Sequence, residues 1–177
     1  MGYHDHTHDL PRNLGFAVLT VSDTRTPETD VSGKVLVERI EKSGHRVVAR
    51  DILKDDVFLI REKVARLIAM GGVDVVVCTG GTGVSPGDVT VEAVLPLLDR
   101  VLPGFGEMFR RESEKEIDTG AMLTRALCGT SAGVVIFCMP GSPGAAKTGA
   151  RLMLSEVAHM VKEARKGRRI AWLDKHF

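Results

Sequence analysis

Apolar runs alternate with amphipathic segments along most of the chain, and this alternation predicts the fold. Continuous or alternating apolar runs predict strands at residues 14–21, 46–53, 73–78 and 133–139. Between the second and third of these runs, Ile60, Val64, Leu67 and Ile68 recur at helical spacing. Strands that alternate with helices are typical of parallel strands joined by helical crossovers. The pattern therefore predicts an α/β fold whose mainly parallel sheet is covered by helices on both faces.

Capping residues suggest where the predicted helices begin and end. Ser32 is a candidate N-cap for a helix that closes near Gly44, and Asp55 or Asp56 is a candidate cap for the next helix. Gly71 and its neighbour should end that second helix. Further helices are expected at residues 90–98, 107–116 and 121–127, and a long final helix should follow residue 144.

Chain length favours one folded domain with a polar segment at each end. A chain of 177 residues buries enough surface to fold without disulfides or a structural metal. Residues 1–12 are expected to form a flexible extension, residues 13–166 the domain and residues 167–177 a tail. The extension contains His4, His6 and His8, for which incidental metal affinity is the favoured interpretation.

Charge and cysteine content exclude several classes of protein. Lys and Arg total 24 against 23 Asp and Glu, so no broad field favours nucleic acid as a partner. The three cysteines form no C-x-x-C pair, which favours a reducing cytoplasm over secretion. Cys78 and Cys138 lie in or at the ends of apolar runs and are interpreted as buried hydrophobic residues. No apolar run approaches the ~20 residues that cross a membrane, so a soluble protein without a membrane partner is expected.

A glycine-rich loop follows the third predicted strand and leads into a helix. Its candidate binding residues are Thr79, Gly80, Gly81, Thr82, Gly83 and Thr90. Glycines let backbone N–H groups approach a ligand, and the start of a helix favours negative charge. The loop therefore suits a phosphate, with the threonine hydroxyls as additional donors. Its spacing matches neither a P-loop nor the dinucleotide-binding fingerprint.

Acidic residues lie near the loop and at other strand ends. Asp88 suits a magnesium ion between carboxylate and phosphate, although capping of the helix near Thr90 explains it equally well. Asp55 follows the second strand, and Ser22 and Asp23 follow the first. Loops at the carboxyl ends of parallel strands gather at one edge of the sheet. The turn at residues 140–144 should join them, either as a second anion-binding nest or as a plain strand-to-helix turn.

Six separated motifs resemble the MoaB/Mog family of molybdenum cofactor biosynthesis. They are Thr79-Gly-Gly-Thr-Gly83, Gly87-Asp-Val-Thr90, Glu92-Ala93, Pro103-Gly-Phe-Gly-Glu107, Ala121-Met-Leu-Thr-Arg125 and Pro140-Gly-Ser-Pro143. The resemblance spans about residues 14–161. It implies a three-layer α/β sandwich with a molybdopterin pocket at one edge of the sheet, and assembly into trimers or hexamers.

The resemblance also implies a reaction and the residues that perform it. Active members adenylylate molybdopterin with Mg-ATP, which gives adenylyl-molybdopterin and pyrophosphate before a molybdate-inserting protein takes over. Asp55 and Asp88 match the family's acidic residues and would place the Mg²⁺ of Mg-ATP. The expected substrate and nucleotide contacts are Ser22, Asp23, Thr79, Gly80, Gly81, Thr82, Gly83, Thr90, Ser113, Pro140, Gly141 and Ser142, of which Ser113 and Ser142 belong to the pterin side.

Two other functions remain open at the level of sequence. A non-catalytic molybdopterin binder or carrier of the same pathway would keep the fold and the pocket without turnover. A hydrolase of nucleotide diphosphates is a further alternative, because a related domain occurs in proteins of the competence-damage-inducible type.

Overall fold

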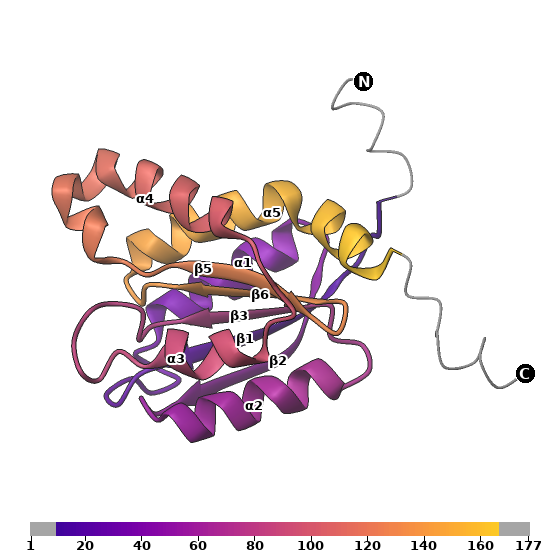
Figure 1. The fold of residues 1–177 in the computed structure, drawn as a ribbon, viewed down its shortest axis with the longest axis horizontal. Coiled ribbons are helices and arrows are strands. Elements are labelled where there is room, and N and C mark those ends of the chain that lie inside the picture. Colours follow the sequence, from indigo (N-terminus) through magenta and orange to yellow (C-terminus); the bar gives the residue numbers. More distant parts are fainter. Residues whose placement is uncertain (1–9, 167–177) are drawn as a thin grey trace, which may run out of the picture.

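The computed structural model describes residues 10–166, which form a six-stranded sheet between two layers of helices (Figure 1). The strands are β1 (Gly15–Val21), β2 (Arg46–Leu53), β3 (Val75–Thr79), β4 (Arg100–Val101), β5 (Leu127–Ser131) and β6 (Val134–Met139). They lie in the order β2-β1-β3-β6-β5-β4. The pairs β1–β2, β1–β3 and β3–β6 are parallel, whereas β5 is antiparallel to both β6 and β4. The predicted three-layer α/β fold with a mainly parallel sheet is confirmed.

Helices cover both faces of the sheet and create two cores. The helices are α1 (Val31–Lys42), α2 (Val57–Ala69), α3 (Thr90–Val94), α4 (Pro103–Ile117) and α5 (Pro143–Arg165), with short 3-10 segments at Leu95–Leu97 and Asp118–Leu123. Alternate residues of β1 supply the two cores: Phe16 and Val18 pack with α1, α4 and α5, whereas Ala17 and Leu19 pack with α2 and α3. Burial on both faces explains why the sequence of β1 is nearly all apolar.

The structure corrects the predicted start of α1. Its N-cap is Asp30, whose carboxylate accepts a hydrogen bond from the Gly33 N–H at 2.8 Å. The Ser32 hydroxyl instead donates to the Gly141 carbonyl at 2.7 Å and so joins α1 to the turn after β6. Gly44 lies beyond the end of the helix with a φ of +80°, a left-handed conformation that favours glycine.

The structure also contains an edge of the sheet that the hydrophobic pattern did not predict. The prediction of a short helix over residues 121–127 is wrong at its C-terminal end, because the 3-10 segment stops at Leu123 and Leu127 begins β5. Strand β5 contains Gly129, where an added Cβ would crowd the Arg100 carbonyl oxygen of β4. A short strand with glycine and polar residues carries little hydrophobic periodicity. Only its pairing with β6 and β4 defines it.

The loops that follow the parallel strands lie at one end of the sheet. Figure 1 shows the loop after β1 and the loop after β3 at the same end of the molecule. Hydrogen bonds connect them to the other strand ends, since Ser22 N donates to Leu53 O and Gly80 N donates to Met139 O. The expected convergence of these loops is therefore present. No helix among the described residues is long and apolar enough to span a membrane.

Candidate functional site

Two glycines with positive φ shape the loop after β3. Gly80 has φ +109° and Gly81 has φ +63°. An added Cβ at Gly80 would collide with the Val21 carbonyl oxygen, and one at Gly81 would collide with the Thr90 hydroxyl. Gly80 also lies against Gly141, because a Cβ at Gly141 would be 3.1 Å from the Gly80 Cα. The glycines therefore allow the loop to fit between β1 and the turn after β6.

Two of the three threonines use their hydroxyl protons to hold this loop. The Thr79 hydroxyl donates to Pro140 O at 3.0 Å, and the Thr90 hydroxyl donates to Gly80 O at 2.8 Å. Both side chains are fully buried. They therefore connect loop segments instead of offering the free donors expected from sequence. The Thr82 hydroxyl oxygen is buried and has no hydrogen-bond partner among the described residues.

Asp55 and Asp88 both lie beside this loop, as predicted. A Cβ at Gly81 would be 3.1 Å from Asp55 Oδ1, and a Cβ at Gly83 would be 2.8 Å from Asp88 Oδ2. Asp23 joins them, since its N–H donates to Asp55 Oδ2 at 3.1 Å and Asp55 N donates to Asp23 Oδ1 at 3.3 Å. Burial raises the pKa of Asp55, and the negative charges of Asp23 and Asp88 raise it further. The three carboxylates thus form a concentrated negative site that a cation would stabilise.

Helix capping leaves both candidate carboxylates available for other roles. Asp56, not Asp55, caps α2, accepting from Phe58 N at 2.8 Å and Leu59 N at 2.9 Å. The N-cap of α3 is Val89, which has no side-chain cap. Asp88 instead accepts from Ser85 N at 2.9 Å within the loop. The capping explanation for Asp88 is therefore wrong.

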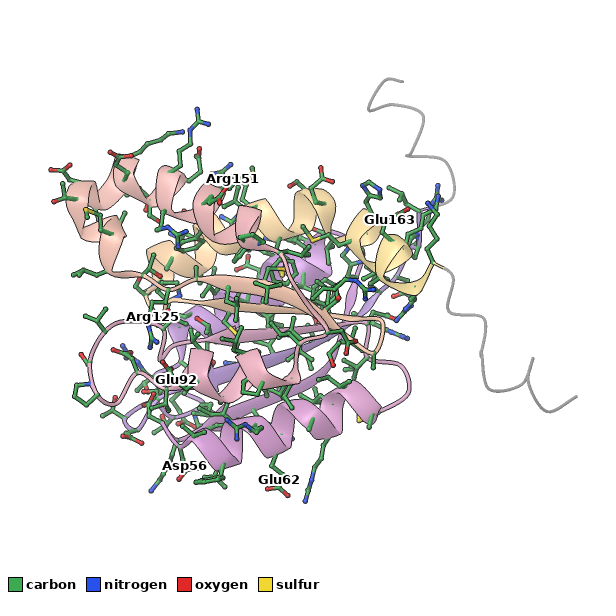
Figure 2. All side chains as sticks on the ribbon, viewed as in Figure 1. Asp56, Glu62, Glu92, Arg125, Arg151 and Glu163 are labelled. Atoms are coloured by element: carbon green, nitrogen blue, oxygen red, sulfur yellow. The ribbon has the colours of Figure 1, made fainter. Side chains whose placement is uncertain are left out.

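Arg125 is a site residue that sequence analysis missed. Its guanidinium donates to Gly83 O and Asp88 O, each at 2.7 Å, and forms an ion pair with Glu92. Figure 2 shows Arg125 near the sheet and Glu92 facing it from α3. In addition, Arg125 N donates to Thr82 O at 2.9 Å. Its position at the end of the Ala-Met-Leu-Thr-Arg motif was the only sequence signal. Glu92, expected to offset the helix dipole, pairs with Arg125.

A small hollow lies on one side of the glycine loop, between α4 and the start of α5. Its volume is about 110 Å³, and its polar lining residues are Ser113, Glu116, Thr124, Ser142 and Thr148. We call it the α4–α5 cavity. Ser142 caps α5 by accepting from Ala145 N at 3.2 Å, so its hydroxyl proton can still be donated. The Thr124 hydroxyl is buried without a hydrogen-bond partner within residues 10–166. The cavity brings together Ser113 and Ser142, the two residues that the family resemblance places on the pterin side.

A larger groove lies on the other side of the loop, at the ends of β1 and β2. It has a volume of about 560 Å³ and includes Ser22, Asp23, Arg25, Arg50 and Lys54 in its lining. We call it the β1–β2 groove. The Ser22 hydroxyl accepts hydrogen bonds from Thr24 N and Arg25 N and so shapes the loop after β1. Asp23 connects the groove to Asp55.

The donor set fits a magnesium ion that arrives with a nucleotide. Within the described part of the chain, no group of three or more His, Cys, Asp or Glu side chains is placed to hold a metal ion. Mg²⁺ is commonly bound by one or two carboxylates together with substrate phosphates. Asp55 and Asp88 can supply such carboxylates beside a loop suited to phosphate.

The cysteines are buried and chemically inert. Cys78, Cys128 and Cys138 are free thiols with no exposed surface. Burial raises the pKa of Cys128 to about 12. Since the thiolate is the reactive form, these side chains act as small hydrophobic residues, as expected for Cys78 and Cys138.

Comparison with known proteins identifies the family to which the chain belongs. The profile of the family described as "Probable molybdopterin binding domain" matches residues 17–159. Molybdenum cofactor biosynthesis protein B of Bacillus subtilis is 40% identical over 168 residues, which cover 94% of this chain and 99% of that protein. A Pyrococcus furiosus protein named molybdopterin adenylyltransferase is also 40% identical, over 93% of this chain and 99% of its own.

A solved structure supports the same assignment. The crystal structure of a molybdenum cofactor biosynthesis protein B has a TM-score of 0.85 and 43% identity, and the match covers 89% of this chain and 99% of that one. The sequence match spans nearly the whole length of these relatives, and the fold agrees with theirs. The chain therefore belongs to the MoaB/Mog family of molybdopterin-binding domains, which serves molybdenum cofactor biosynthesis.

Proposed function

We propose that this protein adenylylates molybdopterin with Mg-ATP to give adenylyl-molybdopterin and pyrophosphate. The observation that carries the proposal is the meeting of Asp55 and Asp88 beside the glycine loop, between the α4–α5 cavity and the β1–β2 groove. A relative of similar length and 40% identity bears the name molybdopterin adenylyltransferase. On this proposal, the cavity and the groove would each take one substrate, with acidic groups at their junction.

The reaction is a displacement at the α-phosphorus of ATP. An oxygen of the terminal phosphate of molybdopterin forms a bond to that phosphorus, while the bond to the bridging oxygen breaks and pyrophosphate leaves with the electron pair. Bound Mg²⁺ would neutralise the phosphate charge, and Asp55 and Asp88 would hold it in place. The loop formed by Gly80, Gly81, Thr82 and Gly83 orients the phosphates. Such chemistry depends on alignment and charge and needs no covalent nucleophile.

The remaining substrate contacts would come from the residues that line the α4–α5 cavity and the β1–β2 groove. Ser113 and Ser142, with Pro140, would contact the pterin from the α4–α5 cavity, and Gly141 lies in the turn between Pro140 and Ser142. Ser22 and Asp23 would contact the nucleotide from the β1–β2 groove.

We further propose that the protein works in the cytoplasm as a trimer or hexamer and passes its product to a molybdate-inserting protein. Light scattering on the purified protein tests the assembly.

A pyrophosphate-release assay with molybdopterin and Mg-ATP tests the proposal. We expect pyrophosphate and adenylyl-molybdopterin in equal amounts, and a loss of at least about 100-fold in rate for Asp88→Ala, because the variant lacks a cation-placing carboxylate. Binding of molybdopterin without pyrophosphate release would indicate a carrier instead. Release of AMP from ADP-ribose would indicate a hydrolase.

A further inference from the structure

The β1–β2 groove contains more positive charge than its own acidic residues neutralise. Asp51 of the groove pairs with Lys63 at 2.7 Å, and the Asp23 carboxylate accepts from the Asp55 N–H. Within residues 10–166, the Lys54 ammonium makes no hydrogen bond or ion pair, and the Arg25 guanidinium makes one long hydrogen bond, of 3.4 Å, to Thr29 O. Two cations of this groove therefore remain available for a ligand.

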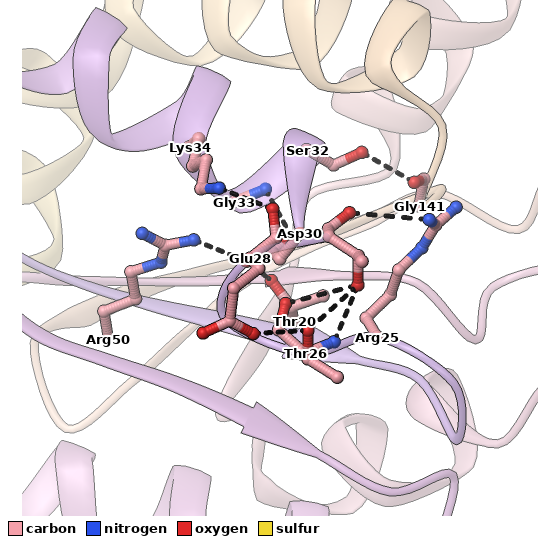
Figure 3. Close-up of polar contacts among 11 residues, drawn as sticks. Thr20, Arg25, Thr26, Glu28, Asp30, Ser32, Gly33, Lys34, Arg50 and Gly141 are labelled. Atoms are coloured by element: carbon pink, nitrogen blue, oxygen red, sulfur yellow. Dashed lines mark hydrogen bonds and ion pairs between the residues drawn. The ribbon is translucent and has the colours of Figure 1, made fainter.

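A third cation of the groove, Arg50, is fixed by a buried carboxylate. Arg50 Nη2 donates to Asp30 Oδ2 at 2.8 Å, and Asp30 is only 1% exposed. Asp30 is fixed in turn by the Thr20 hydroxyl at 3.0 Å and by Gly33 N. Figure 3 shows Arg50 and Arg25 on opposite sides of this buried carboxylate. A guanidinium has five N–H donors, so Arg50 has donors beyond the one that binds Asp30.

The groove begins at the proposed reaction centre. Asp23 lines it and also contacts Asp55, which lies against Gly81. The α4–α5 cavity begins on the other side of the same loop, where Pro140 and Gly141 meet Thr79 and Gly80. The attacking and leaving oxygens of a phosphoryl group lie roughly in line, on opposite sides of the phosphorus. A nucleophile from the cavity therefore requires the leaving group to point toward the groove.

We propose that the β1–β2 groove is a binding site for a diphosphate, with Arg25, Arg50 and Lys54 as its cationic contacts. It would hold the β- and γ-phosphates of ATP before transfer and pyrophosphate afterwards. Arginine suits phosphate because its planar fork donates two parallel hydrogen bonds. This inference rests on the proposed adenylyl transfer and names the part of the nucleotide that the groove recognises.

Calorimetric titration of the full chain with magnesium pyrophosphate, Mg-ATP and AMP tests the inference. The test variant is Arg25→Ala combined with Lys54→Ala, which leaves the Arg50–Asp30 pair intact. We expect its affinity for pyrophosphate and for Mg-ATP to fall by about tenfold or more, because two charge-assisted contacts are lost. Affinity for AMP should stay within about twofold. If the double variant loses affinity for Mg-ATP but not for pyrophosphate, the groove binds the phosphates of the substrate only, and the claim that it also holds pyrophosphate is overturned.

A matched control separates local contacts from general charge. Lys147→Ala removes a cation that lines a different groove, between α1 and α5, and should change none of the three affinities. Arg25→Lys should recover part of the lost affinity. The inference is overturned if the wild-type chain does not bind pyrophosphate, or if the double variant binds Mg-ATP and pyrophosphate like the wild type. It also fails if AMP affinity falls as much as Mg-ATP affinity does.

Failure of the proposed function would look different. In that case the wild-type chain would bind magnesium pyrophosphate through Arg25 and Lys54 but form no adenylyl-molybdopterin. Conversely, normal turnover in the Arg25→Ala/Lys54→Ala variant would support the proposed adenylyl transfer and would contradict the assignment of the groove as a diphosphate site.

Discussion

At Gly80 and Gly81 the backbone adopts conformations that other residues rarely reach, and both positions are closely surrounded. The sequence indicated a phosphate loop from its glycines, its threonines and the helix that follows. The structure adds that each glycine also makes room for a specific neighbour, the Val21 carbonyl for Gly80 and the Thr90 hydroxyl for Gly81. The glycines therefore have a structural role in the fold, apart from the ligand role proposed for the loop.

Replacement of Gly80 by alanine should destabilise the protein by more than about 2 kcal/mol, because positive φ and a backbone collision combine. Urea unfolding measures this change. Gly87→Ala is the matched control in the same loop, since nothing lies within 4 Å of a Cβ there. Equal stability of the two variants would contradict the argument.

The ionised Asp55 side chain should reduce the stability of the protein at neutral pH. Burial and the charges of Asp23 and Asp88 raise the pKa of Asp55. A carboxyl with a raised pKa binds its proton more tightly in the folded state, so the folded state loses stability as the pH rises above the unfolded pKa near ~3.9. Asp55→Asn should therefore raise the free energy of unfolding at pH 7 by up to about 1 kcal/mol, an amount reduced by partial exposure to solvent.

Thermal unfolding at pH 7 and pH 4 checks this expectation, and the gain should shrink at pH 4 as Asp55 takes up a proton. The same variant should lose adenylyl transfer. Glu41→Gln removes an equal charge at an exposed position of α1 and should change neither property. An Asp55→Asn protein less stable than wild type at pH 7 would refute the electrostatic account.

At the scale of elements, the site depends on contacts between segments far apart in the chain. Arg125, just before β5, holds the loop between β3 and α3 through Gly83, Asp88 and Glu92. Ser32 at the start of α1 holds the turn after β6. Periodicity predicted α2 and the four mutually parallel strands β1, β2, β3 and β6, because their burial follows from their own residues. It did not predict β4 and β5, which are short and are defined by pairing with other strands.

Arg125→Lys should loosen the glycine loop, because one ammonium group cannot replace a guanidinium that contacts two carbonyls and a carboxylate. We expect faster hydrogen exchange of the amides in residues 82–89 and a fall in kcat/KM of roughly 10- to 100-fold from misplaced phosphate contacts. Arg151→Lys is the control, since Arg151 pairs with Glu112 on the helical face. Unchanged exchange in residues 82–89 would show that Arg125 does not hold the loop.

At the scale of the whole molecule, Asp30 joins three elements at one buried point. It caps α1, accepts from Thr20 of β1 and pairs with Arg50 of β2. Burial acts to raise the pKa of Asp30, but the hydrogen bond and charge of Arg50, with hydrogen bonds from Gly33 and Thr20, outweigh it and lower the pKa. The resulting stability is present above the ordinary value of 3.8 and is lost as the pH falls through the lowered one.

Asp30→Asn should therefore reduce the free energy of unfolding at pH 7 by roughly 3 kcal/mol, because it leaves Arg50 without its counter-charge. The loss should be smaller near pH 3, where the wild-type pair also weakens. Urea unfolding at both pH values measures the difference. Further replacement of Arg50 by methionine should restore part of the stability at pH 7, and a loss that is independent of pH would exclude the ion pair as its cause.

The sequence by itself determined the α/β class, the parallel core and the loops that contain the candidate site, because strand burial, helix periodicity and glycine content are local properties. It also indicated the loop glycines and acidic residues individually. Only the tertiary structure decided which threonine hydroxyls already donate hydrogen bonds within the fold, and that Asp56 and not Asp55 caps α2. It also showed that Arg125, Arg50 and Asp30 hold the segments around the candidate site. The Asp56 cap is local, but Asp55 suits a cap equally well by sequence. The contacts that Thr79, Thr90, Arg125, Arg50 and Asp30 make with other segments join residues 10 to 61 positions apart, and no local pattern encodes such pairings.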